Sequence, residues 1–290
     1  AAQAEAGDGE LRVESGELFI DNYNFDMIYG IYFSPTGGTR AVALQACEAL
    51  AERLHTDYCL HSYTTPADRE QCPPIPKDAL VVWGTPVYAG RVPNKTLPFV
   101  EQMLRGEDNP LVAIATFGGR AYDDALAEMA QIARRSNLRM VAAAAMATRH
   151  VFSATLGAGR PSPTDIESLT AFCRECNLTE RIALPGEEKE LTYYTPLRQD
   201  SKPARFLKAA PQLDSAQCTH CGGCVLRCPL GSITMEQGTP SITGTCIKCM
   251  ACVEHCPHHA FTFTDEDFLS HIRMIEQHFT TPAPNWFSES

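Results

Sequence analysis

Eight cysteines in the C-terminal part of the chain repeat one spacing. The first four read Cys218-x2-Cys221-x2-Cys224-x3-Cys228-Pro229, and the pattern returns as Cys246-x2-Cys249-x2-Cys252-x3-Cys256-Pro257. Three cysteines spaced by two residues can bind three corners of one iron–sulfur cube, and the fourth, before proline, binds the last corner of the other cube. The spacing therefore predicts two [4Fe–4S] clusters. Their ligands are Cys218, Cys221, Cys224 and Cys256 for cluster 1, and Cys228, Cys246, Cys249 and Cys252 for cluster 2.

Zinc knuckles and a disulfide framework are the alternatives for these cysteines. Zinc sites use paired Cys-x-x-Cys or Cys/His units rather than triplets with a trailing Cys-Pro, and a disulfide framework rarely repeats such a period. Residues 211–264 resemble the bacterial two-cluster ferredoxins. Four histidines close to the repeat are interpreted as donors of hydrogen bonds to the sulfurs rather than as ligands. They are His220, His255, His258 and His259.

Composition limits the classes of partner. The chain has 290 residues, 44% of them hydrophobic and 20% charged, with a net charge of −11. This length allows two domains. An acidic chain is a poor partner for nucleic acid or anionic membranes, and it suits the basic faces of redox proteins. No apolar run is long enough to span a bilayer, and no signal peptide is recognised. Thiolate-bound clusters and free thiols indicate a reducing, anaerobic cytoplasm.

The first half of the chain alternates strands with helices. Apolar runs predict strands at 27–33, 57–63, 79–85, 111–117 and 139–148, and helical spacing predicts helices at 40–54, 95–105, 124–136 and 164–176. Asp123 is expected to cap the third helix. A proline-rich loop follows Tyr63. This alternation predicts βαβ units and a parallel sheet covered on both faces.

The loop after the first of these strands has the features of a phosphate site. Ser34-Pro35-Thr36-Gly37-Gly38-Thr39 joins a strand to a helix. Backbone N–H groups at a helix N-terminus attract anions, hydroxyls add donors, and glycine allows close approach. The loop contains no lysine and no G-x-G-x-x-G, so nucleoside triphosphates and dinucleotides are disfavoured. A plain capped turn is the alternative.

The pattern resembles the flavodoxin phosphate loop, (Thr/Ser)-x-Thr-Gly-x-Thr, which holds the phosphate of FMN. The resemblance assigns the flavin ring to the loops after the third and fourth strands. The residues that it implicates there are Pro86, Val87, Tyr88, Ala89, Gly90, Thr116, Phe117, Gly118, Gly119 and Tyr122, together with Ser34, Thr36, Gly37, Gly38 and Thr39 for the phosphate. Tyr88 and Tyr122 are placed to flank the ring, with packing tyrosines as the alternative. Arg91 and Arg120 stand where flavodoxins carry acidic loops, and we expect solvated surface cations there unless they face the flavin.

Residues 25–264 as a whole resemble the flavodoxin–ferredoxin fusion family of bacteria and archaea. The fold class predicted is an α/β flavodoxin-like, doubly wound, five-stranded parallel sheet followed by a small α+β two-cluster ferredoxin domain. The expected division is an N-terminal extension (1–24), an FMN-binding domain (25–176), a linker (177–210), the ferredoxin domain (211–264) and a C-terminal tail (265–290). Disorder is expected at 1–10, a loose strand at 11–20, a helix at 265–279 and an extended end.

This organisation predicts an iron–sulfur flavoprotein oxidoreductase that passes electrons between two [4Fe–4S] clusters and FMN, and reduces a small organic acceptor or a redox partner protein at the flavin. Candidate catalytic residues are Tyr88, Arg120, Tyr122 and His150. A non-catalytic electron carrier is the alternative, and a redox sensor is a third. Cys173 and Cys176 are read as packing residues, with a redox dithiol as the alternative. The sequence leaves the oligomeric state undecided, with a homodimer as one possibility.

Overall fold

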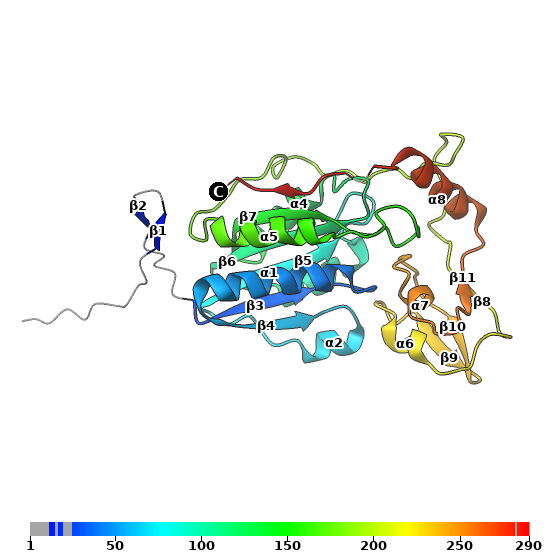
Figure 1. Ribbon diagram of the computed structural model, residues 1–290. Helices are drawn as coiled ribbons and strands as arrows, with labels where there is room; N and C mark the ends of the chain where they lie inside the picture. The colour runs from blue at the N-terminus through cyan, green and yellow to red at the C-terminus, as the bar shows by residue number, and fades with distance from the viewer. Residues whose placement is uncertain (1–11, 15–16, 20–24, 282, 290) are drawn as a thin grey trace, which may run out of the picture.

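The apolar runs of the first half form one parallel sheet in the computed structural model, which describes residues 12–14, 17–19, 25–281 and 283–289. Its parallel strands are β3 (Met27–Tyr32), β4 (Asp57–Ser62), β5 (Ala79–Pro86), β6 (Asn109–Phe117) and β7 (Leu138–Ala147). They lie in the order β4-β3-β5-β6-β7, which is the doubly wound order of flavodoxins. The predicted parallel sheet is therefore confirmed (Figure 1).

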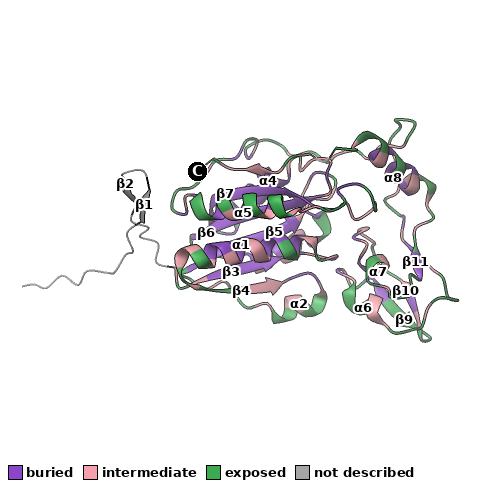
Figure 2. Ribbon diagram, in the orientation of Figure 1, coloured by how far each residue is buried: buried purple, intermediate pink, exposed green. Residues whose placement is uncertain are grey.

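Helices cover both faces of this sheet. α1 (Gly38–Leu54) and α5 (Pro163–Glu175) pack on one face, and α3 (Leu97–Met103) and α4 (Ala125–Arg135) pack on the other. The central strands are buried on both sides (Figure 2), which explains why they read as continuous apolar runs rather than as alternating ones. Gly84 lets α1 approach β5, because a Cβ there would lie 3.1 Å from Thr39 Cγ2 and 3.2 Å from Ala43 Cβ.

Two local expectations in this domain are wrong. The loop after Tyr63 contains a helix, α2 (Pro66–Gln71), which begins with a capping box in which Thr65 Oγ1 accepts from the N–H of Asp68. The N-cap of α4 is Asp124 rather than Asp123, which has a φ of 42° and pairs with Arg120. A short 3₁₀ helix, η1 (Asn94–Thr96), precedes α3.

The end of the chain adds a sixth strand that the sequence did not predict. β12 (Trp286–Phe287) pairs antiparallel with β7, with Trp286 opposite Ala145 and Phe287 opposite Ala144. Asn285 supports this pairing. Its Oδ1 accepts from the N–H of Ala147 at 2.9 Å and from Arg160 Nη2 at 3.1 Å, and its Nδ2 donates to Asp165 at 2.8 Å. The extended end therefore belongs to the first sheet.

The cysteine repeat folds as two similar halves. Its elements are β8 (Gln212–Leu213), α6 (Gly223–Arg227), β9 (Ile233–Glu236), β10 (Thr239–Ile242), α7 (Ala251–Glu254) and β11 (Phe261–Thr262). Left-handed backbone conformations recur 28 positions apart, at His220 and Lys248, at Gly222 and Met250, and at Gly231 and His259. β8 pairs with β11, so the end of the second half closes on the start of the first.

α8 (Glu266–His278) joins the cysteine domain to the end of the chain. Its Phe268 packs edge-to-face against Phe152 and Phe206, and Leu156 packs with Met274 and Ile275. His271 Nδ1 lies 2.8 Å from the carbonyl oxygen of Leu197. The helix therefore contacts both the loop after β7 and segment 177–210.

Near the N-terminus, β1 (Arg12–Glu14) and β2 (Glu17–Phe19) pair as an antiparallel ribbon where one loose strand was expected. The disorder expected at 1–10 falls outside the described residues. Within the part of the chain that the structure describes, no helix is both long and apolar enough to cross a membrane.

We predict that Asn285→Ala destabilises the protein, because it leaves the N–H of Ala147 without its acceptor and removes one donor to Asp165. The expected loss is about 1–3 kcal/mol, or a fall of about 2–6 °C in the midpoint of thermal unfolding followed by circular dichroism. Asn94→Ala, at an exposed position, is the control and should leave the midpoint unchanged. Equal midpoints for the two variants would show that β12 contributes little.

Candidate functional site

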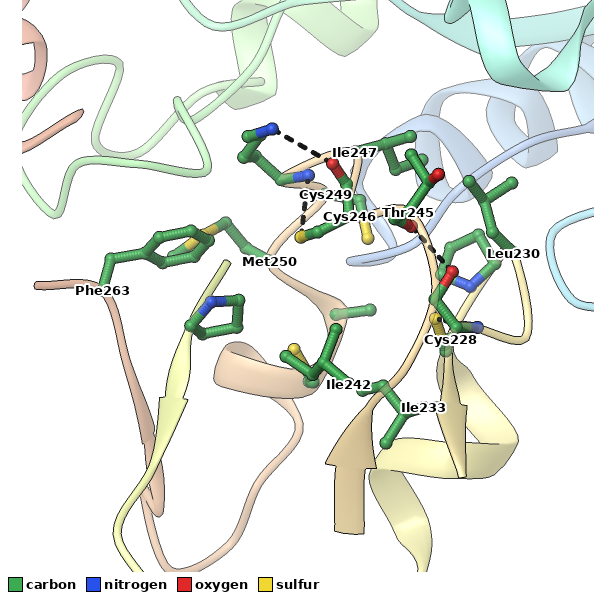
Figure 3. Close-up of a pocket in the computed structure, with 16 residues that line it drawn as sticks. Cys228, Leu230, Ile233, Ile242, Thr245, Cys246, Ile247, Cys249, Met250 and Phe263 are labelled. Carbon is green, nitrogen blue, oxygen red and sulfur yellow. Dashed lines mark hydrogen bonds between the residues drawn. The ribbon is translucent and has the colours of Figure 1, made fainter. Parts of the chain in front are cut away.

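Four cysteines from both halves of the repeat line one cavity (Figure 3). Cys246, Cys249 and Cys252 come from the second triplet, and Cys228 comes from the end of the first. The other lining residues are mostly apolar: Pro211, Pro229, Leu230, Ile233, Ile242, Ile247, Met250, Ala251 and Phe263. Cys249 is buried, and burial raises its pKa, with Cys252, Cys228 and Cys246 raising it further. The structure thus brings together the four residues predicted for cluster 2.

The cysteines predicted for cluster 1 lie nearer the surface. Cys221 is exposed, while Cys218, Cys224 and Cys256 are half-buried. Burial raises the pKa of Cys224, and the neighbouring Cys218 and Cys221 raise it further. The two sets of cysteines therefore have different access to solvent.

Backbone N–H groups donate to the cysteine sulfurs in the same way in both halves. His220 N lies 3.4 Å from Cys218 Sγ, and Lys248 N lies 3.4 Å from Cys246 Sγ. A second repeated pair joins Ser232 N to Cys228 Sγ at 3.2 Å and Ala260 N to Cys256 Sγ at 3.3 Å. Such donors stabilise negative charge on sulfur, so these residues fit thiolate-bound clusters.

Among the described residues, no group of three or more His, Cys, Asp or Glu side chains is close enough together to hold a metal ion. In a cubane each thiolate binds a different iron atom, so its four sulfurs do not converge on one ion. Two of the nearby histidines make backbone contacts instead. His220 Nδ1 lies 2.9 Å from the carbonyl oxygen of Gly238, and His255 Nε2 lies 3.0 Å from that of Pro35.

The predicted phosphate loop lies at the start of α1, a helix of 17 residues. Gly37 has a φ of 91°, and a Cβ at Gly37 or Gly38 would meet nothing within 4 Å, so space is open in front of the loop. Ser34 anchors the loop through two hydrogen bonds. Its N–H donates to Thr64 Oγ1 at 2.8 Å, and its Oγ accepts from the N–H of Arg40 at 3.0 Å. Ser34 thus caps only the N–H of Arg40, and the N-cap residue Gly37 offers no side chain, so the start of α1 beside open space fits an anionic group.

Thr39 links this loop to the fourth parallel strand. Its hydroxyl lies 2.7 Å from that of Thr116, at the end of β6, and both residues are buried. Thr36 is half-buried in the loop. The phosphate loop and the two loops predicted to hold the flavin ring therefore lie at the same carboxyl edge of the sheet.

The loop after β5 is a tight turn. Tyr88 and Arg91 exchange backbone hydrogen bonds of 2.8 and 3.1 Å, and Ala89 and Gly90 have φ values of 49° and 80°. Tyr88 is half-buried. Burial raises its pKa, and Cys249 and Cys246 raise it further, so Tyr88 faces the cysteine domain.

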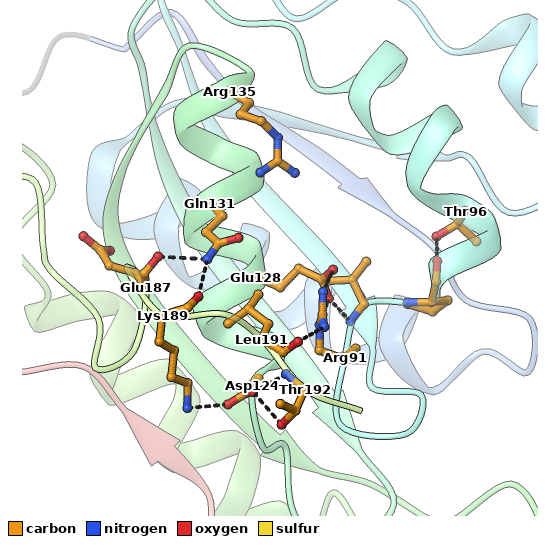
Figure 4. Close-up of polar contacts among 12 residues, drawn as sticks. Arg91, Thr96, Asp124, Glu128, Gln131, Arg135, Glu187, Lys189, Leu191 and Thr192 are labelled. Carbon is orange, nitrogen blue, oxygen red and sulfur yellow. Dashed lines mark hydrogen bonds and ion pairs between the residues drawn. The ribbon is translucent and has the colours of Figure 1, made fainter. Parts of the chain in front are cut away.

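Arg91 does not point into solvent, and the solvated position expected for it is wrong. It forms two hydrogen bonds with the buried carboxylate of Glu128, at 2.9 and 2.6 Å, and its side chain is 13% exposed (Figure 4). The same carboxylate accepts from the N–H of Val92 at 2.7 Å, and Arg91 also donates to the carbonyl oxygen of Leu191 at 3.0 Å. Arg91 therefore holds the turn on α4.

The loop after β6 has a different set of partners. Arg120 pairs with Asp123 and lies 3.7 Å from the centre of the Tyr194 ring. Tyr122 packs against Phe117 and Trp286, with ring centres 5.7 and 6.1 Å away. The packing alternative thus has direct support at Tyr122. The solvated position expected for Arg120 is wrong, because its side chain is 17% exposed and lies between Asp123 and the Tyr194 ring.

His150 lies against this loop as a neutral imidazole. A Cβ on Gly118 would lie 2.4 Å from its Cδ2, so the glycine makes room for the ring. Burial lowers the pKa of His150 to about 4, and His271, Arg120 and Arg149 lower it further. Its Nδ1 accepts from the N–H of Phe152 at 3.1 Å, so the proton is on Nε2. His150 is therefore equipped to donate a hydrogen bond near neutral pH.

The cysteine domain contacts the carboxyl edge of the first sheet. Glu254 of α7 pairs with Arg149 after β7 at 2.7 Å, and Arg69 of α2 donates to the carbonyl oxygen of Pro229 at 2.9 Å. His255 reaches Pro35 of the phosphate loop. Ile247, between two ligands predicted for cluster 2, packs against the core of the first domain. These contacts place the predicted cluster and flavin loops next to each other.

Sequence reasoning missed several residues at this edge. Tyr193 and Tyr194, in the expected linker, stack on Arg91 and Arg120, and Trp286 of the tail contacts Tyr122. The paired tyrosines between Leu191 and Pro196 were a visible signal, but nothing local connected them to loops about 75–105 positions earlier. A second, polar cavity lies at the opposite edge, around Arg105 and Arg135.

Comparisons with known proteins give one family match and several similar solved structures. Residues 210–257 match the family model of the 4Fe-4S dicluster domain. No curated protein matches the chain. Similar solved structures include a flavodoxin of Streptococcus pneumoniae (16% identity, 51% of this chain, 96% of that chain, TM-score 0.36) and one of Megasphaera elsdenii (15%, 50%, 98%, 0.33). Another is rubredoxin oxygen:oxidoreductase of Desulfovibrio gigas (15%, 53%, 36%, 0.37).

The strand order of the sheet and the match to the dicluster domain describe the two parts of the chain. A flavodoxin-like domain is followed by a 4Fe-4S domain that carries the cysteine repeat.

We predict that Cys228→Ser lowers the iron content of the anaerobically purified protein by about half, because it removes one corner from cluster 2. Iron and acid-labile sulfide per chain are the measurement. The residual electron paramagnetic resonance signal of the reduced protein should be that of one cluster. Cys72→Ser, outside the repeat, is the control. Full iron content in Cys228→Ser would contradict the crossed ligation.

Proposed function

We propose that this chain is an oxidoreductase that passes electrons between two [4Fe–4S] clusters and a bound FMN, where a small organic acceptor or a redox partner is reduced. One observation carries the proposal: the cysteine domain docks on the carboxyl edge of the parallel sheet. In doubly wound folds this edge is where the ligand binds. A cofactor in that position would lie beside the cysteine sulfurs rather than on a remote face.

Different residues at this edge would bind the phosphate and the ring of FMN. The phosphate loop, Ser34 to Thr39, supplies backbone donors at the start of α1 and the hydroxyl of Thr36. The turn at Tyr88 and the loop at Gly118 and Gly119 offer backbone N–H groups for the ring. When bound, FMN accepts electrons singly or in pairs, which allows single-electron donors to serve a two-electron reduction.

The difference in exposure supports an order of electron entry. The set that contains exposed Cys221 is the one that an external donor can approach. The set that contains buried Cys249 is near enough to raise the pKa of Tyr88, and Ile247 beside it packs against the first-domain core. We therefore assign cluster 1 to exchange with a partner protein and cluster 2 to exchange with the flavin.

Near the ring, this chain provides one cation and one neutral donor. Arg120, paired with Asp123, lies on the loop after β6, and His150 lies in the loop after β7 and packs against Gly118 of the loop after β6. A neutral histidine can orient an acceptor through a hydrogen bond but has no proton to lose as an imidazolium at neutral pH. The proton delivered to the substrate would then come from solvent or from the reduced flavin.

We predict that Thr36→Ala weakens FMN binding about tenfold and leaves riboflavin binding unchanged, because the lost hydroxyl faces only the phosphate. Quenching of flavin fluorescence during titration of flavin-depleted protein gives both affinities. Equal weakening for FMN and riboflavin would place the effect on folding rather than on the phosphate. A wild-type protein that binds neither flavin would refute the flavin part of the proposal.

Reversing the charge of Arg149 should slow electron transfer between the domains. Arg149→Glu puts two carboxylates at the contact with Glu254 and weakens docking. The observable is the rate of flavin bleaching after rapid reduction of the clusters, by stopped-flow spectroscopy under anaerobic conditions. We expect at least about a tenfold decrease with unchanged cofactor content.

Arg174→Glu is the matched control, since its 2.7 Å pair with Glu52 lies between α5 and α1, away from the docking contacts. Equal rates in the two variants would argue against electron transfer across this interface. Candidate acceptors can then be added to the reduced wild type. Reoxidation by ferredoxin-type proteins alone, with no small molecule active, would identify a carrier rather than an enzyme.

A further inference from the structure

The two loops expected to hold the flavin ring, 86–91 and 117–123, are connected by a residue from segment 177–210. We propose that Tyr194 is a positioning residue for the flavin, which sets the spacing between these two ring loops before the cofactor binds. This inference rests on the proposed flavin site. It concerns a residue that lies far from the phosphate loop and from both ring loops in the sequence.

The backbone of Tyr194 is bound to the first ring loop. Its N–H donates to the carbonyl oxygen of Ala89 at 2.8 Å. Ala89 lies in the tight turn closed by Tyr88 and Arg91, and the hydrogen bonds from Arg91 to Glu128 anchor that turn on α4. Tyr194 is therefore attached to a rigid part of the first loop.

The side chain of Tyr194 reaches the second ring loop. The guanidinium of Arg120 lies 3.7 Å from the centre of the tyrosine ring, and the Arg120 side chain is only 17% exposed. A cation over an aromatic face is stabilised more strongly when water is excluded. The ring also lies among charges that it can sense: Arg120 and Asp123 both act on the Tyr194 hydroxyl, whose pKa is raised chiefly by burial.

A third contact closes the connection. Asp123, the partner of Arg120, packs against Gly90, where a Cβ would lie 2.6 Å from Asp123 Oδ2 and 2.8 Å from Asp123 Cβ. Ala89, Gly90, Asp123, Arg120 and Tyr194 thus form a closed series of contacts around the mouth of the expected ring site. Separating the loops requires the loss of at least one of these contacts.

The neighbouring Tyr193 provides a matched comparison within the same segment. Its ring lies 4.7 Å from the guanidinium of Arg91, and Tyr193 is 48% exposed. Arg91 is held by two hydrogen bonds to Glu128 whether or not Tyr193 is present. Loss of the Tyr193 ring should therefore leave the first loop in place. Loss of the Tyr194 ring leaves Arg120 paired only with Asp123 of its own loop and removes the contact that joins it to the first loop.

Loops that already hold their spacing lose less conformational freedom when a ligand binds. We expect Tyr194→Ala to weaken FMN binding about fivefold, with Tyr194→Phe and Tyr193→Ala within about twofold of wild type by the same principle. Flavin fluorescence quenching on the full-length, cluster-loaded chain gives these affinities. Tyr194→Leu, which fills similar space without an aromatic face, replaces the alanine variant if that variant does not fold.

A second measurement does not need the flavin. Amide hydrogen exchange of the FMN-depleted, cluster-loaded protein should accelerate at both ring loops in Tyr194→Ala and at neither in Tyr193→Ala. Wild-type affinity together with unchanged exchange in the Tyr194 variants would overturn the proposal, as would equal effects in Tyr193→Ala. If the wild type binds no flavin, the proposed function fails, and faster exchange in Tyr194→Ala would still support the connection between the loops.

Discussion

β12 pairs antiparallel with β7, so the segment that follows the cysteine domain is attached to the sheet of the first domain. This attachment restrains the position of the cysteine domain. The docking contacts themselves are modest. Arg149 and Glu254 are both about one-third exposed, and ion pairs of this kind contribute little alone. Because segment 177–210 holds one end of the cysteine domain and α8 with β12 holds the other, few relative positions remain accessible. Two attachments raise the effective concentration of weak contacts far more than a single flexible linker would.

The same restraint gives the two sets of cysteines different surroundings. Both sets repeat the same spacing and the same N–H donors to sulfur, at Cys218 and Cys246 and at Cys228 and Cys256. The set around Cys249 is enclosed by apolar side chains, and Ile247 beside it packs against the core of the first domain. Solvent exposure and local charge tune iron–sulfur potentials as strongly as ligand type does. The same spacing therefore does not give the two sets of cysteines the same surroundings, and docking distinguishes them.

Features set by neighbouring residues could be predicted from the sequence, and features set by distant ones could not. The strands follow from apolar runs, and the site at the start of α1 follows from Ser34 to Thr39, because the chemistry lies within one loop. The position of Cys228 beside Cys246, Cys249 and Cys252 follows from the repeated cysteine spacing. By contrast, β12 is a two-residue strand whose pairing is decided by Asn285 and by the small side chains of β7. Arg91 looked like a surface cation because Glu128, its partner, is 37 positions away. Tyr194 stacks on Arg120 only once the sheet has formed.

The distribution of charge bears on how a partner finds the exposed cysteines. The chain carries −11 in total, yet residues 211–264 contain three carboxylates and two cations, so nearly all of that charge lies in the rest of the chain. One of the three carboxylates, Glu254, is already paired with Arg149. Residues 25–176 are nearly neutral, with 16 carboxylates and 14 cations. The negative charge is concentrated in the N-terminal extension, 1–24, with six carboxylates and one cation, and in the C-terminal tail, 265–290, with five carboxylates and one cation. Steering over a Debye length and contact at the cysteines would thus arise from different parts of the chain. Because docking fixes the two domains relative to each other, the proposed function would have the same interface set both the approach of a partner and the path from the cysteines to the flavin loops.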